Sequence, residues 1–149
     1  MLEMWCWIAS GRPMPSQEQR ATVEFTSTRP VVAIVDDDLA VRSALSFSLE
    51  TEGIAVCAYA SSAELLAEVP SADCFVIDLK LPGMDGLDLL AELRRRRIAA
   101  PAVLITTQPS ASVRRRAATA GAALIEKPLL DDALFRQIRE ALTGIGRAS

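Results

Sequence analysis

The stretch VVAIVDDD, residues 31–38, places an apolar run directly before three aspartates. Four of the five apolar residues are β-branched. The run does not alternate with polar residues, which is typical of a parallel strand covered on both faces. Three carboxylates at the end of such a strand repel one another unless a positive group lies among them. The stretch therefore predicts a buried strand that ends at a charged site.

Further strand-like runs follow this one, separated by helical patterns. Apolar runs predict strands at 31–36, 54–59, 73–78, 101–106 and 123–126. Apolar residues at helical spacing, with capping signals, predict helices at 38–52, 62–68, 86–97, 110–120 and 130–142. Successive strand–helix units predict a doubly wound α/β domain. We expect the domain to span 30–149, after a poorly ordered N-terminal extension at 1–29.

Several signals predict where helices stop and which faces turn inward. Gly53 is expected to end the first helix, and Ser61 with Glu64 forms a capping-box pattern for the second. The inward stripe predicted for the first helix consists of Val41, Leu45, Phe47, Ser48 and Leu49. The inward residues predicted for the third and fifth helices are Leu87, Leu90, Leu93, Leu134, Ile138, Ala141 and Leu142.

Composition narrows the classes of function. The net charge of −3 argues mildly against a nucleic-acid-binding surface, and the absence of histidine removes the usual general base and the commonest transition-metal ligand. The three cysteines are widely spaced without a CxxC pair, so we expect no zinc site or disulfide framework and a cytoplasmic location. We read Cys57 and Cys74 as small core residues. No segment approaches the ~20 apolar residues of a membrane helix.

Reactive side chains stand at the carboxyl ends of four predicted strands. Asp36 and Asp37 end the first strand, Asp78 the third and Thr106 the fourth, while Lys127 follows the fifth. In a doubly wound sheet these strand ends share one crevice. Clustered carboxylates suit a hard divalent cation such as Mg²⁺, which would offset their repulsion and leave room for phosphate oxygens. The third aspartate, Asp38, is expected to cap the first helix instead.

Taken together, these motifs resemble the receiver domain of two-component response regulators. The resemblance rests on IVDDD at the first strand, VIDLKLPGMDG at the third, LIT at the fourth and IEKP at the fifth. It covers about residues 31–142, with the motifs in order and at family-like spacing. It implies a flavodoxin-like five-stranded parallel sheet of order 2-1-3-4-5 with five helices.

The resemblance also implies roles for individual residues. Asp78 would be the phosphoacceptor, and Asp36 and Asp37 the acid pair that holds Mg²⁺ or Mn²⁺, with Asp37 the direct ligand and Asp36 acting mainly through water. Asp78 and the backbone carbonyl of Lys80 would also bind the metal. Thr106 would bond the new phosphoryl group, and Lys127 would pair with it.

The function implied is that of a signalling switch in a bacterial phosphorelay, not a metabolic enzyme. The chain would take a phosphoryl group from the phosphohistidine of a sensor histidine kinase, or from a phosphotransfer protein, onto Asp78. It could form a homodimer through the fourth helix, fifth strand and fifth helix. We expect no direct contact with nucleic acid and no membrane association.

Other functions remain open at this point. A degenerate receiver could act as a constitutive scaffold, although the site residues are intact. An aspartyl-phosphate phosphatase of the haloacid dehalogenase type needs a DxD at its first strand, which Asp36 and Asp38 formally provide. A nucleotide-binding domain would need a glycine-rich loop after the first strand, and DDDLAVRS has no glycine.

One feature departs from the usual receiver pattern. Most receivers carry Tyr or Phe near the end of the fifth strand, where this chain has Leu124, and no aromatic residue occurs between Thr106 and Lys127. The stretch from Gly121 to Lys127 is also one residue shorter than is typical. We therefore expect phosphorylation chemistry to be retained while its conformational readout differs.

Overall fold

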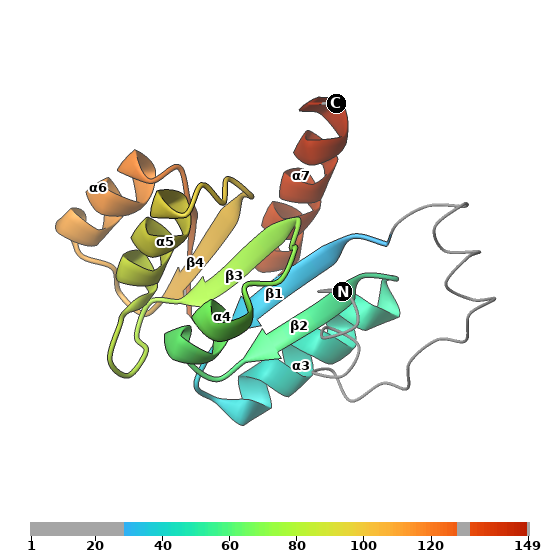
Figure 1. Ribbon diagram of the computed structural model, residues 1–149, viewed down its shortest axis with the longest axis horizontal. Coiled ribbons are helices and arrows are strands. Elements are labelled where there is room, and N and C mark those ends of the chain that lie inside the picture. Colours follow the sequence, from blue (N-terminus) through green and yellow to red (C-terminus); the bar gives the residue numbers. More distant parts are fainter. Residues whose placement is uncertain (1–28, 128–131, 149) are drawn as a thin grey trace.

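The computed structural model describes residues 29–127 and 132–148. Five parallel strands form one sheet in the order β2-β1-β3-β4-β5, as predicted (Figure 1). The three inner strands, β1, β3 and β4, each have a partner on both sides. The strands are β1 (Val31–Val35), β2 (Ala55–Tyr59), β3 (Cys74–Asp78), β4 (Ala102–Thr106) and β5 (Ala123–Glu126).

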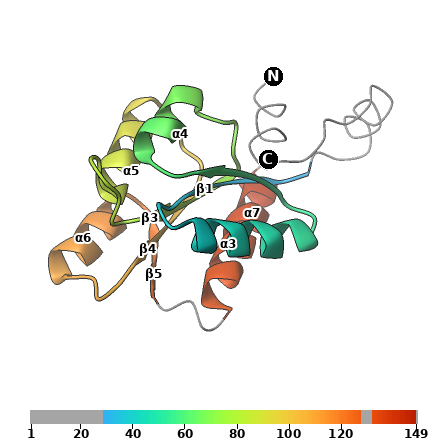
Figure 2. The same ribbon diagram turned by 90° about the horizontal axis from the view of Figure 1, so that it is seen from below.

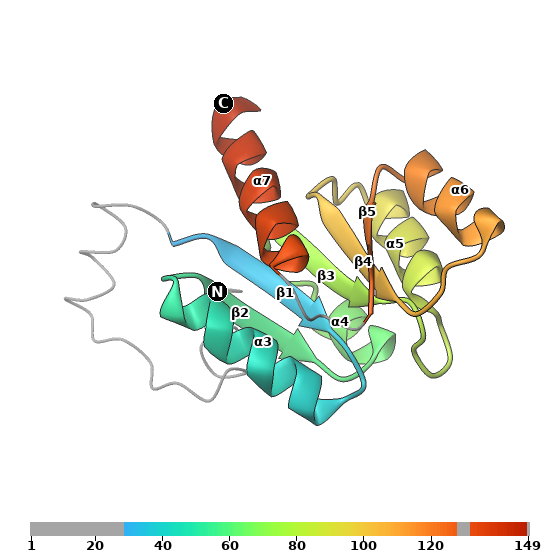
Figure 3. The same cartoon turned by 180° about the vertical axis from the view of Figure 1, so that it is seen from behind.

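Five helices in the described part of the chain cover both faces of the sheet. Helices α3 and α7 pack on one face and α4, α5 and α6 on the other, as Figures 2 and 3 show from two directions. The chain is therefore doubly wound, and the predicted flavodoxin-like architecture is confirmed. The helices are α3 (Leu39–Thr51), α4 (Ser62–Glu68), α5 (Gly86–Arg95), α6 (Ala111–Thr119) and α7 (Ala133–Ala148).

Local signals in the sequence fix most helix ends. The Asp38 carboxylate accepts a hydrogen bond from Ala40 N at 2.9 Å, so Asp38 is the predicted N-cap of α3. Ser61 Oγ accepts from Glu64 N at 3.2 Å, while the Glu64 carboxylate accepts from Ala60 N at 2.8 Å. In this capping box the Glu64 carboxylate thus bonds the N–H of the residue before the N-cap, and not the N–H of the N-cap itself. Gly53, with φ of +84°, follows the end of α3 as expected.

Successive strand residues serve opposite layers of the core. On β1, Val31, Ala33 and Val35 face α4, α5 and α6, whereas Val32 and Ile34 face α3 and α7. Every residue of β1, β3 and β4 is buried. The predicted inward residues Leu87, Leu90, Leu93, Leu134 and Ile138 are buried too, and Ala141 and Leu142 pack against the core. The sheet thus gives the strand ends a rigid support.

Two predictions about side chains are wrong. Phe47 is 74% exposed, because it lies two positions from both Leu45 and Leu49, which places it on the opposite side of α3. Cys57 and Cys74 are the buried core residues that the sequence predicts, but the expectation that the cysteines form no disulfide is wrong, because Cys74 alone is free among the described cysteines. Cys57 is disulfide-bonded, and its partner is not among the described residues.

The predicted extension at 1–29 lies almost wholly outside the described residues, so the domain boundary stays a prediction. Arg29, the first described residue, donates from Nε to Gly53 O at 3.2 Å. None of the helices that the structure describes is long and apolar enough to cross a membrane.

Candidate functional site

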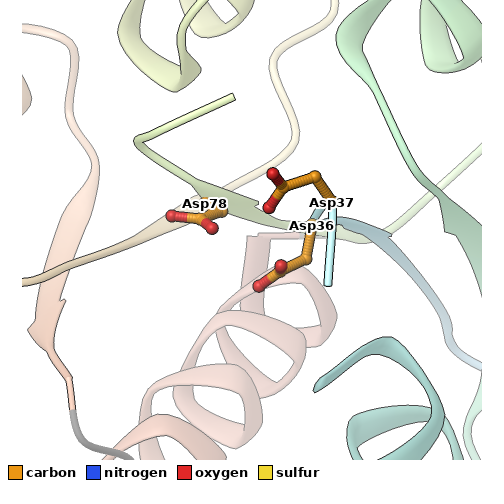
Figure 4. Close-up of side chains that lie close together, drawn as sticks. All are labelled: Asp36, Asp37 and Asp78. Carbon is orange, nitrogen blue, oxygen red and sulfur yellow. The ribbon is translucent and has the colours of Figure 1, made fainter. Parts of the chain in front are cut away.

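Three carboxylates meet where β1 and β3 end. Asp36 and Asp37 directly follow β1, and Asp78 is the last residue of β3. One carboxylate oxygen from each lies within 4.8 Å of the others (Figure 4). Asp36 and Asp78 are buried, whereas Asp37 is exposed. The cluster therefore has a buried floor and an open side, as a site entered from solvent requires.

Asp36 is the most constrained of the three acids. Its Oδ1 accepts a hydrogen bond from Asp38 N at 2.9 Å, while its buried Oδ2 has no hydrogen-bond partner among the described residues. Burial raises the pKa of the Asp36 carboxyl above its ordinary value. Repulsion from Asp78 and Asp37 acts in the same direction, and the Asp38 N–H and Lys127 oppose it. A buried oxygen without a partner costs free energy, which a bound cation or water would remove.

Asp78 is held by one side-chain and one backbone donor. Its Oδ2 pairs with Lys127 Nζ at 3.1 Å, and its Oδ1 accepts from Lys80 N at 3.2 Å. The Lys127 side chain is 29% exposed, so it reaches the site from the solvent side. In the described part of the chain, one ammonium thus pairs with a cluster of three carboxylates, which leaves an excess of acidic groups at this edge.

Thr106 completes the set of predicted side chains at the strand ends. It is buried at the end of β4, and its carbonyl accepts from Lys127 N at 2.7 Å. Its hydroxyl donates to Thr107 O over 3.5 Å, a long and therefore weak bond. The structure thus places Thr106 beside the backbone of Lys127 with a hydroxyl that is weakly held.

The loop after Asp78 approaches the site more closely than the sequence revealed. Gly86 begins α5, and its N–H donates to Leu79 O at 2.8 Å. A Cβ added to Gly86 would lie 2.6 Å from Asp78 O and 2.9 Å from Leu79 Cα, both backbone atoms. In the sequence analysis this glycine appears only as the last residue of the motif VIDLKLPGMDG. The packing shows that its last glycine lets α5 touch the backbone of Asp78.

Two further polar side chains support the loops around the cluster, and the sequence analysis missed both. Arg42 Nη1 donates to Asp36 O at 2.7 Å. The buried Ser62 donates from Oγ to Met84 O at 3.0 Å, which ties α4 to the loop between β3 and α5. Both side chains bond to backbone carbonyls across a turn or between elements, and no residue pattern within one element signals such contacts.

An open groove of about 580 Å³ borders the acid cluster. Asp37 and Lys80 stand on its site side, and Leu87 and Val113 add apolar surface from α5 and α6. Arg116 of α6, which pairs with Asp88 at 3.6 Å, lines it too. The groove gives a small molecule or a partner side chain access to the exposed edge of the cluster.

The donor set fits a hard divalent cation. Carboxylate oxygens from Asp36, Asp37 and Asp78 converge, histidine and thiolate donors are absent from the described cluster, and one buried oxygen lacks a partner. Mg²⁺ uses one or two carboxylates and keeps waters or phosphate oxygens in its remaining positions. Asp38 does not join the cluster, because its carboxylate caps α3.

Comparison with known proteins gives one consistent result. The family model of the response regulator receiver domain matches residues 32–139. The transcriptional regulatory protein FixJ of Azorhizobium caulinodans is 39% identical over 114 residues, which cover 74% of this chain and 54% of the relative. Nodulation protein W of Bradyrhizobium diazoefficiens is 35% identical over 112 residues, or 73% of this chain and 49% of the relative. The chain spans about half the length of these curated relatives.

Solved structures agree with this match. A CheY-like response regulator receiver domain protein from Methanospirillum hungatei aligns with a TM-score of 0.77 at 30% identity, over 82% of this chain and all of that one. The response regulator StyR aligns with a TM-score of 0.72 at 31% identity, over 78% of this chain and 60% of that one.

Proposed function

This chain belongs to the family of response regulator receiver domains, and we propose that it accepts a phosphoryl group on Asp78 in a two-component phosphorelay. The observation that carries the proposal is the position of the Asp78 carboxylate. It is buried, pairs with Lys127 at 3.1 Å and lies among the oxygens of Asp36 and Asp37. A nucleophile, a cation to balance charge and a candidate metal site therefore meet at one point.

Asp36, Asp37 and Asp78, with the backbone carbonyl of Lys80, are proposed to hold Mg²⁺ or Mn²⁺. Asp37 is proposed as the direct ligand from the acid pair, because it is exposed to the groove, with Asp36 acting mainly through water. When bound, the metal offsets negative charge on the transferring group and on the acids.

The proposed reaction is a displacement at phosphorus. A carboxylate oxygen of Asp78 attacks the phosphorus of a phosphohistidine on a sensor histidine kinase or a phosphotransfer protein. The O–P bond forms as the P–N bond breaks, and the imidazole leaves with the electron pair of that bond. The product is an acyl phosphate, whose added charge Lys127 is placed to neutralise. The chain catalyses this transfer onto itself and later loses the group to water, so it is a switch and not a metabolic enzyme.

Thr106 is proposed to report the event, because its weakly held hydroxyl can rotate toward the new phosphoryl oxygens. The surface formed by α6, β5 and α7 is then the proposed route to partners, including a homodimer. Its charged side chains include the pair between Arg114 and Glu126, with Nη2 and Oε1 at 2.6 Å, which links α6 to β5. Action in the cytoplasm, without direct binding to nucleic acid or membrane, remains part of the proposal.

The site also bears on the alternatives. A phosphatase of the haloacid dehalogenase type would need Asp36 and Asp38 in one reactive centre, but the Asp38 carboxylate bonds Ala40 N on α3. A degenerate scaffold would not need a buried Asp78 paired with Lys127. Both observations favour the phosphoacceptor.

Intact mass spectrometry after incubation with acetyl phosphate tests the proposal. We expect one phosphate on the wild-type chain with Mg²⁺, none in EDTA, and none on Asp78→Asn with Mg²⁺. Asp88→Asn is the matched control, because Asp88 is an exposed acid on α5 outside the cluster, and it should label like the wild type. Labelling of Asp78→Asn at the wild-type level would refute the assignment, and an unlabelled wild type would favour the scaffold.

A further inference from the structure

Three of the four polar atoms of Asp36 are fixed by protein partners. Its N–H donates to Tyr59 O at 3.1 Å, and its Oδ1 accepts from Asp38 N at 2.9 Å. Its carbonyl oxygen accepts from Arg42 Nη1 at 2.7 Å. Only Oδ2, buried beside Asp37 and Asp78, is left without a hydrogen bond among the described residues. The turn between β1 and α3 is therefore held so that one oxygen points into the acid cluster.

The bond from Arg42 differs from the others because it acts on the peptide unit that joins the two acids. The carbonyl of Asp36 and the N–H of Asp37 lie in one rigid plane. Fixing that oxygen restricts the rotation of the plane, and with it the direction in which the Asp37 side chain leaves the backbone. Arg42 can hold the carbonyl firmly because its own N–H bonds Asp38 O at 3.0 Å in the first turn of α3.

Asp37 needs such support more than its neighbours do. Its side chain is exposed and makes no hydrogen bond or ion pair within the described residues, whereas Asp36 and Asp78 are each bonded through a carboxylate oxygen. Its direction therefore depends on the backbone alone. Asp37 is also the acid of the pair that lines the open groove.

We infer that Arg42 is a positioning residue for the metal site: by holding the carbonyl of Asp36, it orients Asp37 toward the cation. Arg42 bonds a backbone carbonyl and forms no ion pair with a carboxylate of the described residues, so its removal lowers metal affinity without removing a ligand. Outer groups that orient metal ligands typically contribute roughly 10- to 100-fold to affinity. The inference rests on the proposed metal-dependent function.

Calorimetric titration of the whole chain with Mn²⁺, well below its unfolding temperature, tests this role. Arg42→Met keeps most of the apolar stem and removes the donors, and we expect it to raise the Kd for Mn²⁺ about tenfold. Arg42→Lys keeps a charge and a donor but not the planar fork, so its Kd should lie between the two. Arg115→Met is the matched control, since Arg115 is exposed on α6 and has no partner among the described residues, and its Kd should stay within twofold of wild type.

Phosphorylation by acetyl phosphate at varied Mg²⁺ supplies a second readout. In Arg42→Met the Mg²⁺ concentration for half-maximal rate should rise about tenfold, like the Kd, while the rate at saturating Mg²⁺ stays within twofold of wild type. A general structural defect would instead lower the saturated rate.

The possible outcomes separate this inference from the proposed function. If the wild type binds no Mn²⁺, the proposed metal site itself is wrong. If the wild type binds and Arg42→Met binds equally well, only the role of Arg42 is refuted, even if that variant melts earlier. Should Arg42→Met fail to fold, Arg42→Lys decides: a Kd within the spread of the Arg115→Met control overturns the inference, and a higher one supports it.

Discussion

The centre of the sheet and its β5 edge are built differently. At the centre, β1 and β3 each pair with strands on both sides, and all of their residues are buried. At the edge, β5 pairs with β4 alone among the described strands, and its residues are half-buried or exposed. The acid cluster stands at the ends of β1 and β3, and Thr106 at the end of β4, which is also buried and paired on both sides, whereas Lys127 follows the edge strand β5.

This difference assigns chemistry and conformational change to separate regions. A metal site needs fixed ligand directions, and the doubly paired strands supply them. A switch needs an element that can move at small cost, and a half-buried edge strand is such an element. The loop after Thr106 adds to this, because Thr107 and Gln108 are exposed and Gln108 has a φ of +46°.

The largest expected effect comes from breaking the centre at Gly86. Gly86→Ala places a Cβ against the backbone of Asp78 and Leu79, which cannot rotate away. We expect the free energy of unfolding, measured with urea, to fall by about 3 kcal/mol. We also expect phosphorylation of Asp78 to slow. Gly53→Ala is the control: it has a positive φ but open space, so it should cost only about 1 kcal/mol with phosphorylation unchanged. Equal effects of the two variants on phosphorylation would contradict the close contact at Gly86.

Mg²⁺ should increase the difference between the centre of the sheet and its β5 edge, because it is expected to bind the acid cluster at the centre. When Mg²⁺ binds only the folded state, a free Mg²⁺ concentration of a hundred times the Kd adds about 2.7 kcal/mol to the free energy of unfolding. The melting temperature of the wild type should therefore rise with Mg²⁺, and that of Asp37→Asn should rise much less. A melting temperature that ignores Mg²⁺ up to millimolar concentrations would rule out a metal site at these strands.

A smaller effect is expected from pH in the metal-free protein. Burial raises the pKa of the Asp36 carboxyl above its ordinary value of 3.8. The carboxyl therefore ionises more readily in the unfolded chain than in the folded one. This contribution to stability is fully present below pH 3.8 and is lost as pH rises through the raised pKa. In EDTA, the free energy of unfolding of Asp36→Asn, measured with urea, should therefore rise relative to that of the wild type between pH 4 and pH 7. A constant difference across that range would show that burial does not shift Asp36.

The smallest expected change lies at the edge, at Leu124. Leu124 is half-buried and packs against the core beside α5 and α6, and it offers no hydroxyl and less area than an aromatic ring. With beryllofluoride bound, we expect Thr106 and the loop 107–112 to move while Leu124 keeps its rotamer, with coupling carried by helix packing. Paired structures, or the methyl shifts of Leu124, would check this. An inward swing of Leu124 would refute it, and a motionless Thr106 would favour a scaffold.

Much of the fold could be predicted because its signals are local. The strands begin and end within one residue of their predicted limits, since an unbroken apolar run reflects burial on both faces. The caps at Asp38 and Ser61 follow from side chains that bond their own helix. The error at Phe47 came from assigning one stripe to residues that the helical period separates.

The candidate site was predictable in its members but not in its contacts. Parallel strands bring their carboxyl ends to one edge, so Asp36, Asp37, Asp78, Thr106 and Lys127 could be placed together from the sequence. Which acid is buried, which oxygen lacks a partner and which ammonium pairs with Asp78 became visible only in the structure.

The sequence by itself thus determined the elements, their order and the residue types at the strand ends, because periodicity and caps depend on neighbours along the chain. Only the tertiary structure decided that Gly86 meets the backbone of Asp78, that Ser62 ties a distant loop, and that Arg42 holds the peptide between the two acids. These contacts depend on how separate elements pack and on which rotamers the packing allows, and no pattern along the chain encodes either.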